Sequence, residues 1–296
     1  MKIRIGVGLG AGGVSDSDAF CQAVQHMEQL GFDSLWLSEV LTTPVVDPLA
    51  GLAFAAGVTS KLKLGTTMTV TGRNPVRMAK ELATIDRFSN GRLLLVFVPG
   101  LTDHFEDQAL GIPVAERGAI LDEVLPLTRR LWSEDNVSHT GPRFCYEGLT
   151  LQPRPLQDPL EVWLGGTAKS ALRRAGRLSD GWLPSLCTPA EAAAGRAAIE
   201  AAAAEAERRI DPEHFGISLS YAREAIPAAQ VARIAQRRPG LDPASVIPVG
   251  PSGLRDLLRQ YIDVGFSKFV VRPAETPRDW SGALDELASD VLELQT

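Results

Sequence analysis

The segments LGTTMTV (64–70), GRNPVRMAKELATIDRFSNGR (72–92) and LLLVFVPG (93–100) decide the fold of this chain. The first and last segments are short, apolar and typical of buried strands. The middle segment has helix signals, with Asn74 as an N-cap, Pro75 at the first helical position and Asn90-Gly91 at the end. Strand, helix and strand in this order predict a βαβ unit with parallel strands.

The helix in this unit has the two faces of a crossover helix. An apolar stripe and a polar stripe divide its side chains, which include Val76, Ala79, Leu82, Ala83, Asp86 and Arg87. The same alternation of strands and helices continues along the whole chain. We expect eight strands, at Ile3–Leu9, Ser34–Ser38, Leu62–Met68, Arg92–Val98, Glu161–Leu164, Trp182–Ser185, Phe215–Tyr221 and Lys268–Val271.

Eight strands, each followed by a helix or helical connection, favour a (β/α)8 TIM barrel of the α/β class. No linker rich in Ser and Gly interrupts the pattern, so we expect one domain over residues 1–296. Residues 133–160 contain four prolines and no helical period. We interpret them as an insertion in the barrel.

The composition of the chain indicates which partners and which cellular compartment to expect. The chain has 296 residues, 45% hydrophobic and 22% charged, and a net charge of −6, which argues against a nucleic-acid partner. The three cysteines lie outside any CxxC motif and favour a reducing compartment. The first residues lack the apolar block of a signal peptide and no apolar run is long enough to span a membrane, so we expect a cytoplasmic protein.

Residues 8–13 (GLGAGG) match the GxGxxG pattern of dinucleotide-binding folds, and Glu39 ends the next predicted strand. However, the apolar alternation of the first strand runs through these glycines, and the next helix begins late. Gly6, Gly8 and Gly10 then share one strand face, which would leave space for a flat ring at the barrel mouth. We therefore favour the barrel over the dinucleotide fold.

Two further segments lie at strand ends and are candidates for a site at the C-terminal mouth. Gly165-Gly166-Thr167 precedes a helix, where free backbone N–H groups can hold a phosphate; a tight turn that binds nothing is the alternative. Ser38 and Glu39 end the second strand, and Glu39 is our candidate catalytic residue. A carboxylate there can also act only as a hydrogen-bond partner.

Other chemistries have little support in the sequence. The four histidines lack metal-ligand spacing, so we expect no metal, and His104 alone falls in a loop at the predicted mouth. GxSxG is absent, and no cysteine lies in a recognisable catalytic motif. A bound organic cofactor is therefore the expected source of any chemistry.

Several motifs in combination resemble the luciferase-like monooxygenases, a family of flavin- and deazaflavin-dependent oxidoreductases. They are GFDSLWLSE (31–39), the stretch 64–92 quoted above, ALGIPVAERGAILDEVLPLTRRLW (109–132), LQPRPLQ (151–157), VWLGG (162–166) and SDGWLPS (179–185). RNPV with SDGWLPS is most similar to the coenzyme F420 branch of that family.

The resemblance implies a barrel that binds reduced F420 at its mouth and transfers a hydride to a small organic substrate, as a homodimer. It implies a phosphate at Gly165, Gly166 and Thr167, and a role in orientation for Ser38 and Glu39. Thr67, Met68, Pro99 and Gly100 would line the ring, and Thr67-Met68 would form the strained bulge found in many members.

This chain also departs from the family pattern. Val40 replaces a common histidine, Val96 and Val98 replace glycines, and Leu101 replaces an acid or tryptophan. We therefore keep two alternatives, an FMN-dependent monooxygenase with the same scaffold and a binding protein that has lost catalysis.

Overall fold

The computed structural model describes residues 1–10, 14 and 16–296, and eight parallel strands form its main sheet. Their order around the sheet is β8-β7-β4-β3-β2-β1-β10-β9. Two isolated bridges, Trp182 to Phe215 and Ser185 to Ser218, link the edge strands β8 and β9 and nearly close the barrel. The strands are β1 (Arg4–Gly8), β2 (Ser34–Ser38), β3 (Lys63–Thr69), β4 (Leu93–Val98), β7 (Val162–Leu164), β8 (Gly181–Trp182), β9 (Gly216–Tyr221) and β10 (Lys268–Pro273).

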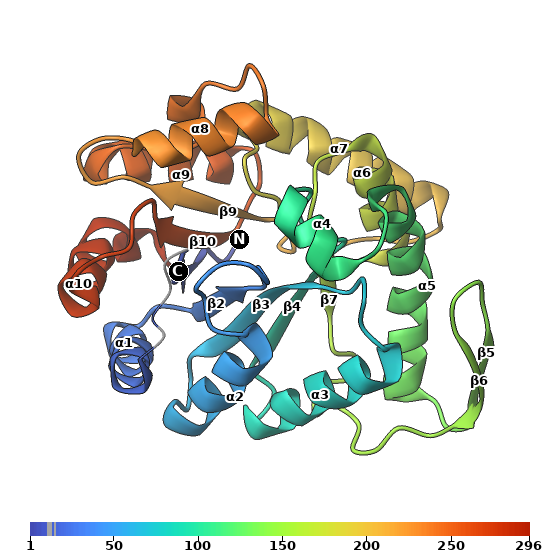
Figure 1. Ribbon diagram of the computed structural model, residues 1–296. Coiled ribbons are helices and arrows are strands. Elements are labelled where there is room, and N and C mark those ends of the chain that lie inside the picture. Colours follow the sequence, from blue (N-terminus) through green and yellow to red (C-terminus); the bar gives the residue numbers. More distant parts are fainter. Residues whose placement is uncertain (11–13, 15) are drawn as a thin grey trace.

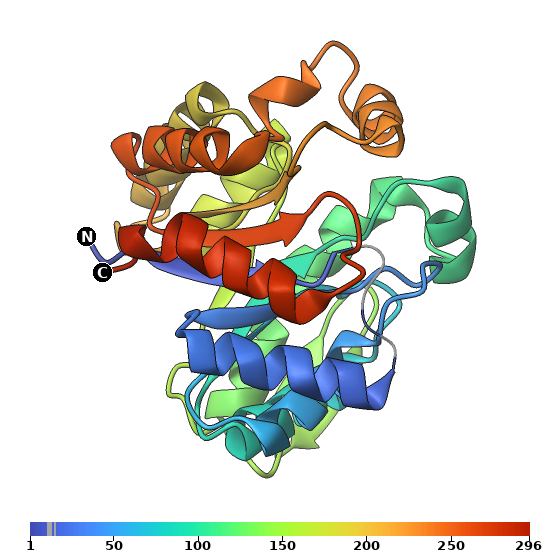
Figure 2. The ribbon, with the colours of Figure 1, turned by 90° about the vertical axis from the view of Figure 1, so that its left-hand side faces the viewer.

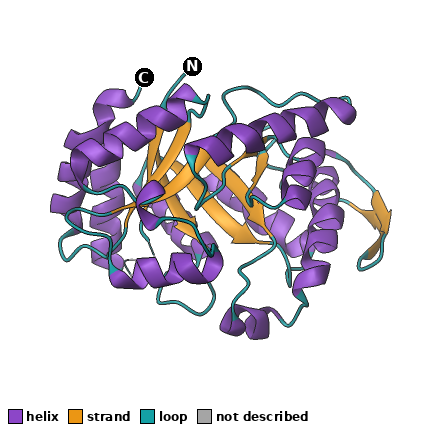
Figure 3. Ribbon diagram, turned by 90° about the horizontal axis from the view of Figure 1, so that it is seen from above, coloured by secondary structure: helices purple, strands orange, loops and turns teal. Residues whose placement is uncertain are grey.

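Helices surround this barrel, as Figures 1 and 3 show, so the predicted (β/α)8 fold is confirmed. Its α-helices are α1 (Ser17–Leu30), α2 (Pro48–Val58), α3 (Pro75–Phe88), α4 (His104–Leu110), α5 (Val114–Ser133), α6 (Lys169–Leu178), α7 (Pro189–Glu205), α8 (Ala228–Arg237), α9 (Gly250–Asp263) and α10 (Trp280–Val291). Two 3-10 turns complete them, η1 (Pro243–Ser245) and η2 (Leu292–Leu294). None of the helices in the described ranges is both long and apolar enough to cross a bilayer.

Local sequence explains where the helices begin. The Asn74 side chain accepts hydrogen bonds from the N–H groups of Val76 and Arg77 at the start of α3, as predicted. Thr188 and Glu191 form both bonds of a capping box at the start of α7. The sequence did not predict α4 or α8, because each lies in a connection where no long apolar period marks it.

The predicted insertion contains a two-stranded antiparallel hairpin, β5 (Val137–Thr140) and β6 (Cys145–Leu149). Figure 1 shows it beside α5, apart from the barrel strands. Glu123 of α5 joins it to the barrel by accepting hydrogen bonds from the N–H of Phe144 at 3.1 Å and from that of Arg143 at 3.4 Å.

One prediction for α3 was wrong. Asp86, which we assigned to the polar stripe, is fully buried. Its carboxylate accepts hydrogen bonds from the N–H groups of Leu156 and Gln157, at 2.7 and 2.9 Å, and from the Gln157 side chain at 2.6 Å. A buried carboxylate is tolerated here because three N–H donors replace its water.

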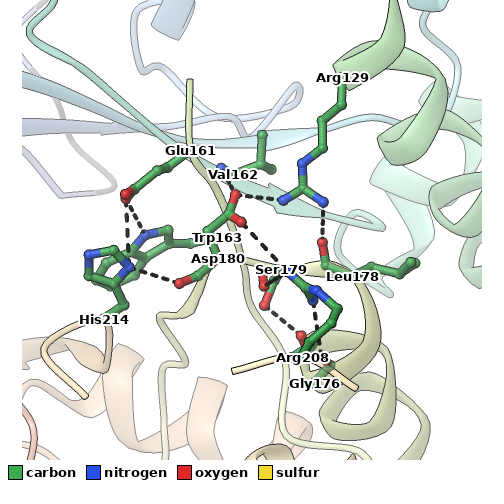
Figure 4. A network of polar contacts seen from close by, with 11 residues as sticks. Arg129, Glu161, Val162, Trp163, Gly176, Leu178, Ser179, Asp180, Arg208 and His214 are labelled. Atoms are coloured by element: carbon green, nitrogen blue, oxygen red, sulfur yellow. Dashed lines mark hydrogen bonds and ion pairs between the residues drawn. The ribbon is translucent and has the colours of Figure 1, made fainter. Parts of the chain in front are cut away.

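A polar network joins the strands near the seam of the barrel (Figure 4). Asp180, which precedes β8, accepts hydrogen bonds from Arg129 of α5 at 2.5 Å and from the N–H of Val162 at 2.8 Å. Arg208, which precedes β9, lies 3.7 Å from the same carboxylate and donates to the Ser179 carbonyl. The network therefore ties α5, β7 and β8 to the segment that leads into β9.

The two ends of the chain lie together at the N-terminal end of the barrel (Figure 2). Ile3 donates its N–H to the Thr296 hydroxyl, and Thr296 donates its N–H to the Ile3 carbonyl, at 3.0 and 3.1 Å. The coils of α4 and α8 lie at the opposite end in this view, where the strands terminate. Those two helices therefore lie at the same end of the barrel as the candidate site.

Candidate active site

The predicted site residues come from neighbouring strands. Ser38 ends β2 and pairs with Thr67 of β3, and Thr67 pairs with Val96 of β4. Pro99 and Gly100 follow β4 directly, and Gly165 follows β7, which pairs with β4. The fold thus brings these residues to one sector of the mouth.

Met68 does not face that sector. It is fully buried in the main core, with the side chains that lie between strands and helices. Because side chains alternate along a strand, Thr67 and Thr69 have the opposite orientation, toward the barrel interior. The expected bulge is also absent at this point, since β3 pairs with β4 in unbroken register from Leu64 to Thr69. The Met68 side chain therefore packs into the core, and the assignment of Met68 to the ring stays a prediction that concerns its backbone.

Glu39 is held by other protein groups. One carboxylate oxygen accepts a hydrogen bond from the N–H of Thr69 at 2.7 Å, and the other pairs with the Arg73 guanidinium. Arg73 also donates to the Thr69 carbonyl at 3.1 Å, and only 6% of the Glu39 side chain is exposed. This geometry fits a residue that holds the end of β3, which was the alternative to a catalytic role.

A protein side chain occupies the space beside the first glycine of the β1 face, Gly6. A Cβ atom on Gly6 would clash with Ser34 and with the Trp36 indole, and one on Gly65 of β3 would clash with the same indole. Trp36, whose Nε1 donates to the Ser34 hydroxyl at 2.9 Å, fills the space inside the barrel. Gly6 and Gly65 therefore make room for the Trp36 indole, so the expectation of a ring beside Gly6 was wrong. A Cβ atom on Gly8 or Gly10, nearer the mouth, would lie 3.4 Å or more from its neighbours.

The dinucleotide alternative has lost its structural basis. Gly8 ends a strand of a parallel barrel and α1 begins at Ser17, after the N-cap Asp16. Residues 11–13 of the GxGxxG pattern lie outside the described residues. An open sheet, which this alternative required, is excluded by the bridges between β8 and β9.

The two valines of β4 have a structural partner across the sheet. Val96 belongs to the small apolar cluster in the barrel interior, with Trp36, Leu183 and Val270, and Val98 packs against it. A Cβ atom on Gly165 would lie 2.9 Å from Cγ1 of Val98. The missing side chain at Gly165 therefore leaves the space that Val98 occupies.

The turn after β7 presents exposed backbone at the start of a helix. Gly166 has a φ of +91°, a conformation that favours glycine, and residues 166–170 are exposed. No side chain caps α6, since the N-cap residue Ala168 makes no side-chain bond. The first N–H groups of α6 are thus available to an anion.

The sequence did not predict helix α4, which lies at the mouth end of the barrel. His104, which we expected in a loop, is the first residue of α4, and Asp103 caps that helix. Glu106 of α4 is buried and accepts two hydrogen bonds from Thr42, each of 2.9 Å. Arg117 of α5 donates to the Leu101 carbonyl and to Asp107, both at 2.7 Å. These contacts fix the segment from Leu101 to α4 against the barrel.

Arg272 was also missed, although the alternation of KFVVRP suggested its orientation. It shares a face of β10 with Val270, which belongs to the interior cluster. Arg272 is the penultimate residue of β10 and therefore lies at the C-terminal mouth. Its guanidinium donates to Ser220 at 3.0 Å and to Ser218 at 2.7 Å, both on β9.

Comparison with known proteins agrees with the family resemblance of the sequence motifs. Residues 1–287 match the family described as luciferase-like monooxygenase. An F420-dependent glucose-6-phosphate dehydrogenase of Intrasporangium calvum is 28% identical, over 90% of this chain and 91% of that protein. An FMNH(2)-dependent dimethylsulfone monooxygenase of Pseudomonas putida is 35% identical, over 41% of this chain and 34% of its own.

Among solved structures, an F420-dependent secondary alcohol dehydrogenase in complex with an F420-acetone adduct is similar with a TM-score of 0.83. The likeness covers 100% of both chains at 18% identity, which supports the fold alone. Because the family match spans nearly the whole sequence, this chain belongs to the luciferase-like monooxygenase family.

Proposed function

We propose that this protein is an F420-dependent oxidoreductase that transfers a hydride between the reduced deazaflavin and a small organic substrate. The observation that carries the proposal is the Gly165-Gly166-Thr167 turn, which is exposed from Gly166 onward at the uncapped start of α6. It adjoins the sector of the mouth formed by β2, β3 and β4. Similarity to F420-dependent relatives over nine-tenths of the chain supports the same cofactor.

The residues at the turn fit a phosphate group. Gly166 has the backbone conformation of a left-handed turn, and any Cβ there would lie 3.1 Å from Ala171 of α6. The start of a helix favours a negative charge through its free N–H groups and its dipole. Gly165, Gly166 and Thr167 would therefore hold the phosphate through the backbone.

The remaining site residues would position the ring and exclude water. Thr67 faces the interior, and Ser38 lies exposed beside it at the end of β2. Pro99 and Gly100 form the wall after β4, where the Thr71 hydroxyl donates to the Pro99 carbonyl at 3.0 Å. Glu39 would act as a positioning residue, because its contacts with Thr69 and Arg73 hold the adjacent end of β3.

The bound cofactor would supply a hydride, which carries two electrons and one proton, to an electrophilic atom of the acceptor. The acceptor then needs one further proton. Val40 and Leu101 cannot supply it, so solvent or another group would.

An FMN-dependent monooxygenase remains the second candidate, because a relative with that activity shares 35% identity over part of the chain. A binding protein without catalysis was suggested by the valines of β4. The fit between Val98 and Gly165 weakens that alternative, since the added side chain has its own space.

We further infer a homodimer that acts in the cytoplasm, as a single domain without a nucleic-acid partner. The net charge of −6 supports the last point. Sedimentation of the purified protein measures the oligomeric state.

The test is a calorimetric titration of the purified protein with F420 and, separately, with FMN. We expect tighter binding of F420, and weaker F420 binding in Gly166→Val. Gly31→Val is the matched control, since Gly31 has a φ of +87° and lies on the far side of the barrel, after α1. The control should lose comparable stability but keep its affinity for F420.

Unchanged F420 affinity in Gly166→Val would contradict the phosphate assignment. Much tighter binding of FMN would favour the monooxygenase instead.

A further inference from the structure

The guanidinium of Arg272 holds a positive charge inside the barrel mouth. Nε and Nη1 donate to the hydroxyls of Ser220 and Ser218, which are neutral partners. Nη2 has no protein acceptor among the residues that the structure describes. The two serines therefore orient the guanidinium and leave one of its nitrogens to an additional acceptor.

The charge of Arg272 has no counter-ion among the described residues. Within the described part of the chain, no carboxylate forms an ion pair with Arg272. Burial lowers the pKa of Arg272 to about 10, and the charges of Arg233 and Arg237 contribute to the same shift. The group still carries its proton at neutral pH, and nearby charges of the same sign make a bound anion favourable.

Arg233 and Arg237 lie in the connection between β9 and α9, which contains α8. This connection has its own small core, in which Ala222, Ile234, Val246 and Ile247 pack with Ala274. Gln230 of α8 fastens it to the barrel by donating to the Ala274 carbonyl at 2.7 Å. The core holds α8, and with it Arg233 and Arg237, near the end of β10.

Arg233 donates through Nη2 to the Gln230 side-chain oxygen, a neutral acceptor, and its other nitrogens are less well provided for. Its Nε is sealed from solvent and has no hydrogen-bond partner within the described ranges, and neither Arg233 nor Arg237 forms an ion pair there. Burial, followed by the charge of Arg237, lowers the pKa of Arg233. Three arginines are thus found in this sector, and none of them forms an ion pair with a carboxylate of the described residues.

This sector differs from the one assigned to the cofactor. The phosphate turn follows β7, whereas Arg272 is on β10, and β8 and β9 separate the two strands around the barrel. The cofactor sector extends from β7 in the other direction, through β4, β3 and β2. The side of β9 and β10 is therefore available to the second reactant.

We propose that Arg272, with the charges of Arg233 and Arg237 nearby, binds a carboxylate or phosphate group of the substrate, so that the acceptor is an acidic small molecule. This inference rests on the proposed function for the role of the ligand as acceptor. The binding of an anion at Arg272 does not depend on it. Charge-assisted bonds from an oriented guanidinium suit both kinds of anion.

The experiment measures anion binding to the cofactor-free protein by calorimetry at low ionic strength, with inorganic phosphate and acetate as separate probes. We expect saturable binding of at least one probe, weakened about 10- to 100-fold in Arg272→Gln. Arg209→Gln is the matched control, because Arg209 is exposed, precedes β9 at the opposite end of the barrel and loses the same charge. It should bind like the wild type.

Arg272→Lys keeps the charge and replaces Arg272→Gln in the titration if that variant does not fold. It should bind the probe more weakly than the wild type, because it cannot reproduce the fork held by the two serines. Equal affinity of the wild type and both Arg272 variants, or no binding by the wild type, would overturn the proposal.

A parallel F420 titration separates this inference from the proposed function. Unchanged F420 affinity in Arg272→Gln supports a substrate role. An equal loss of F420 affinity assigns the guanidinium to the cofactor and overturns the proposal. Anion binding at Arg272 in a protein that binds no F420 would reject the proposed function and retain the anion site.

Discussion

Single side chains decide how much space the mouth offers. Val98 and Gly165 face each other on β4 and after β7, and a Cβ atom placed on Gly165 would lie only 2.9 Å from Val98 Cγ1, which leaves no room for a methyl group. Val98, which departs from the family pattern, thus occupies space left open by Gly165 of the shared VWLGG motif. Whether this pair is coupled can be measured directly.

We predict that Gly165→Ala lowers the free energy of unfolding by about 1–3 kcal/mol, since overpacking forces neighbours apart. Val98→Ala in the same chain should restore part of that loss, with a coupling energy of about 0.5–3 kcal/mol. Urea unfolding of the wild type, both single variants and the double variant gives the cycle. Additive effects of the two substitutions would show that the residues do not share this space.

At the scale of elements, the motifs behind the family resemblance hold distant segments together. Asp86 lies in the stretch 72–92 and Gln157 in LQPRPLQ, and the two side chains form a hydrogen bond of 2.6 Å. Gln157 also donates to the Leu93 carbonyl at the start of β4. These contacts fix the connection that leads from the insertion into β7.

We predict that Asp86→Asn costs about 2–3 kcal/mol of stability, because the amide cannot accept from all three N–H donors that the carboxylate satisfies. Glu81→Gln on the same helix is the control. Glu81 is exposed and lies 3.9 Å from Arg73, so its loss should cost less than about 1 kcal/mol. Chemical denaturation measures both, and equal effects would contradict a special role for Asp86.

At the scale of the whole molecule, one core joins all the strands of the barrel. It contains Ile5 of β1, Leu35 of β2 and Phe269 of β10, and also Trp182 of β8 and Ile217 of β9 on the two sides of the seam. A shared core favours cooperative unfolding, which is what the single-domain proposal requires. The network around Asp180 strengthens the same seam (Figure 4).

We predict a single unfolding transition, with tryptophan fluorescence and far-ultraviolet circular dichroism changing together. Asp180→Asn should lower the free energy of unfolding by about 1–2 kcal/mol, as expected for a partly exposed charged network. The midpoint of the transition should therefore fall, and the transition should stay single. Two separate transitions in the wild type would indicate two folding units and contradict the single domain.

By itself, the amino-acid sequence determined the barrel, its eight strands, the βαβ unit at 63–98 and the cap at Asn74. These features depend on residues close together along the chain, whose periodicity and turn chemistry are local. The same local signals placed Ser38, Thr67 and Gly165 at strand ends, and strand ends of a parallel barrel meet at one mouth.

Only the tertiary structure decided which groups those residues contact. Trp36 fills the space beside Gly6 and Gly65, Glu39 pairs with Arg73, and Met68 packs against the helices. Arg272 likewise meets its serines and neighbouring arginines only after β9, β10 and α8 come together. The physical reason is that burial, charge balance and free volume are properties of segments far apart in the chain, which no local pattern records.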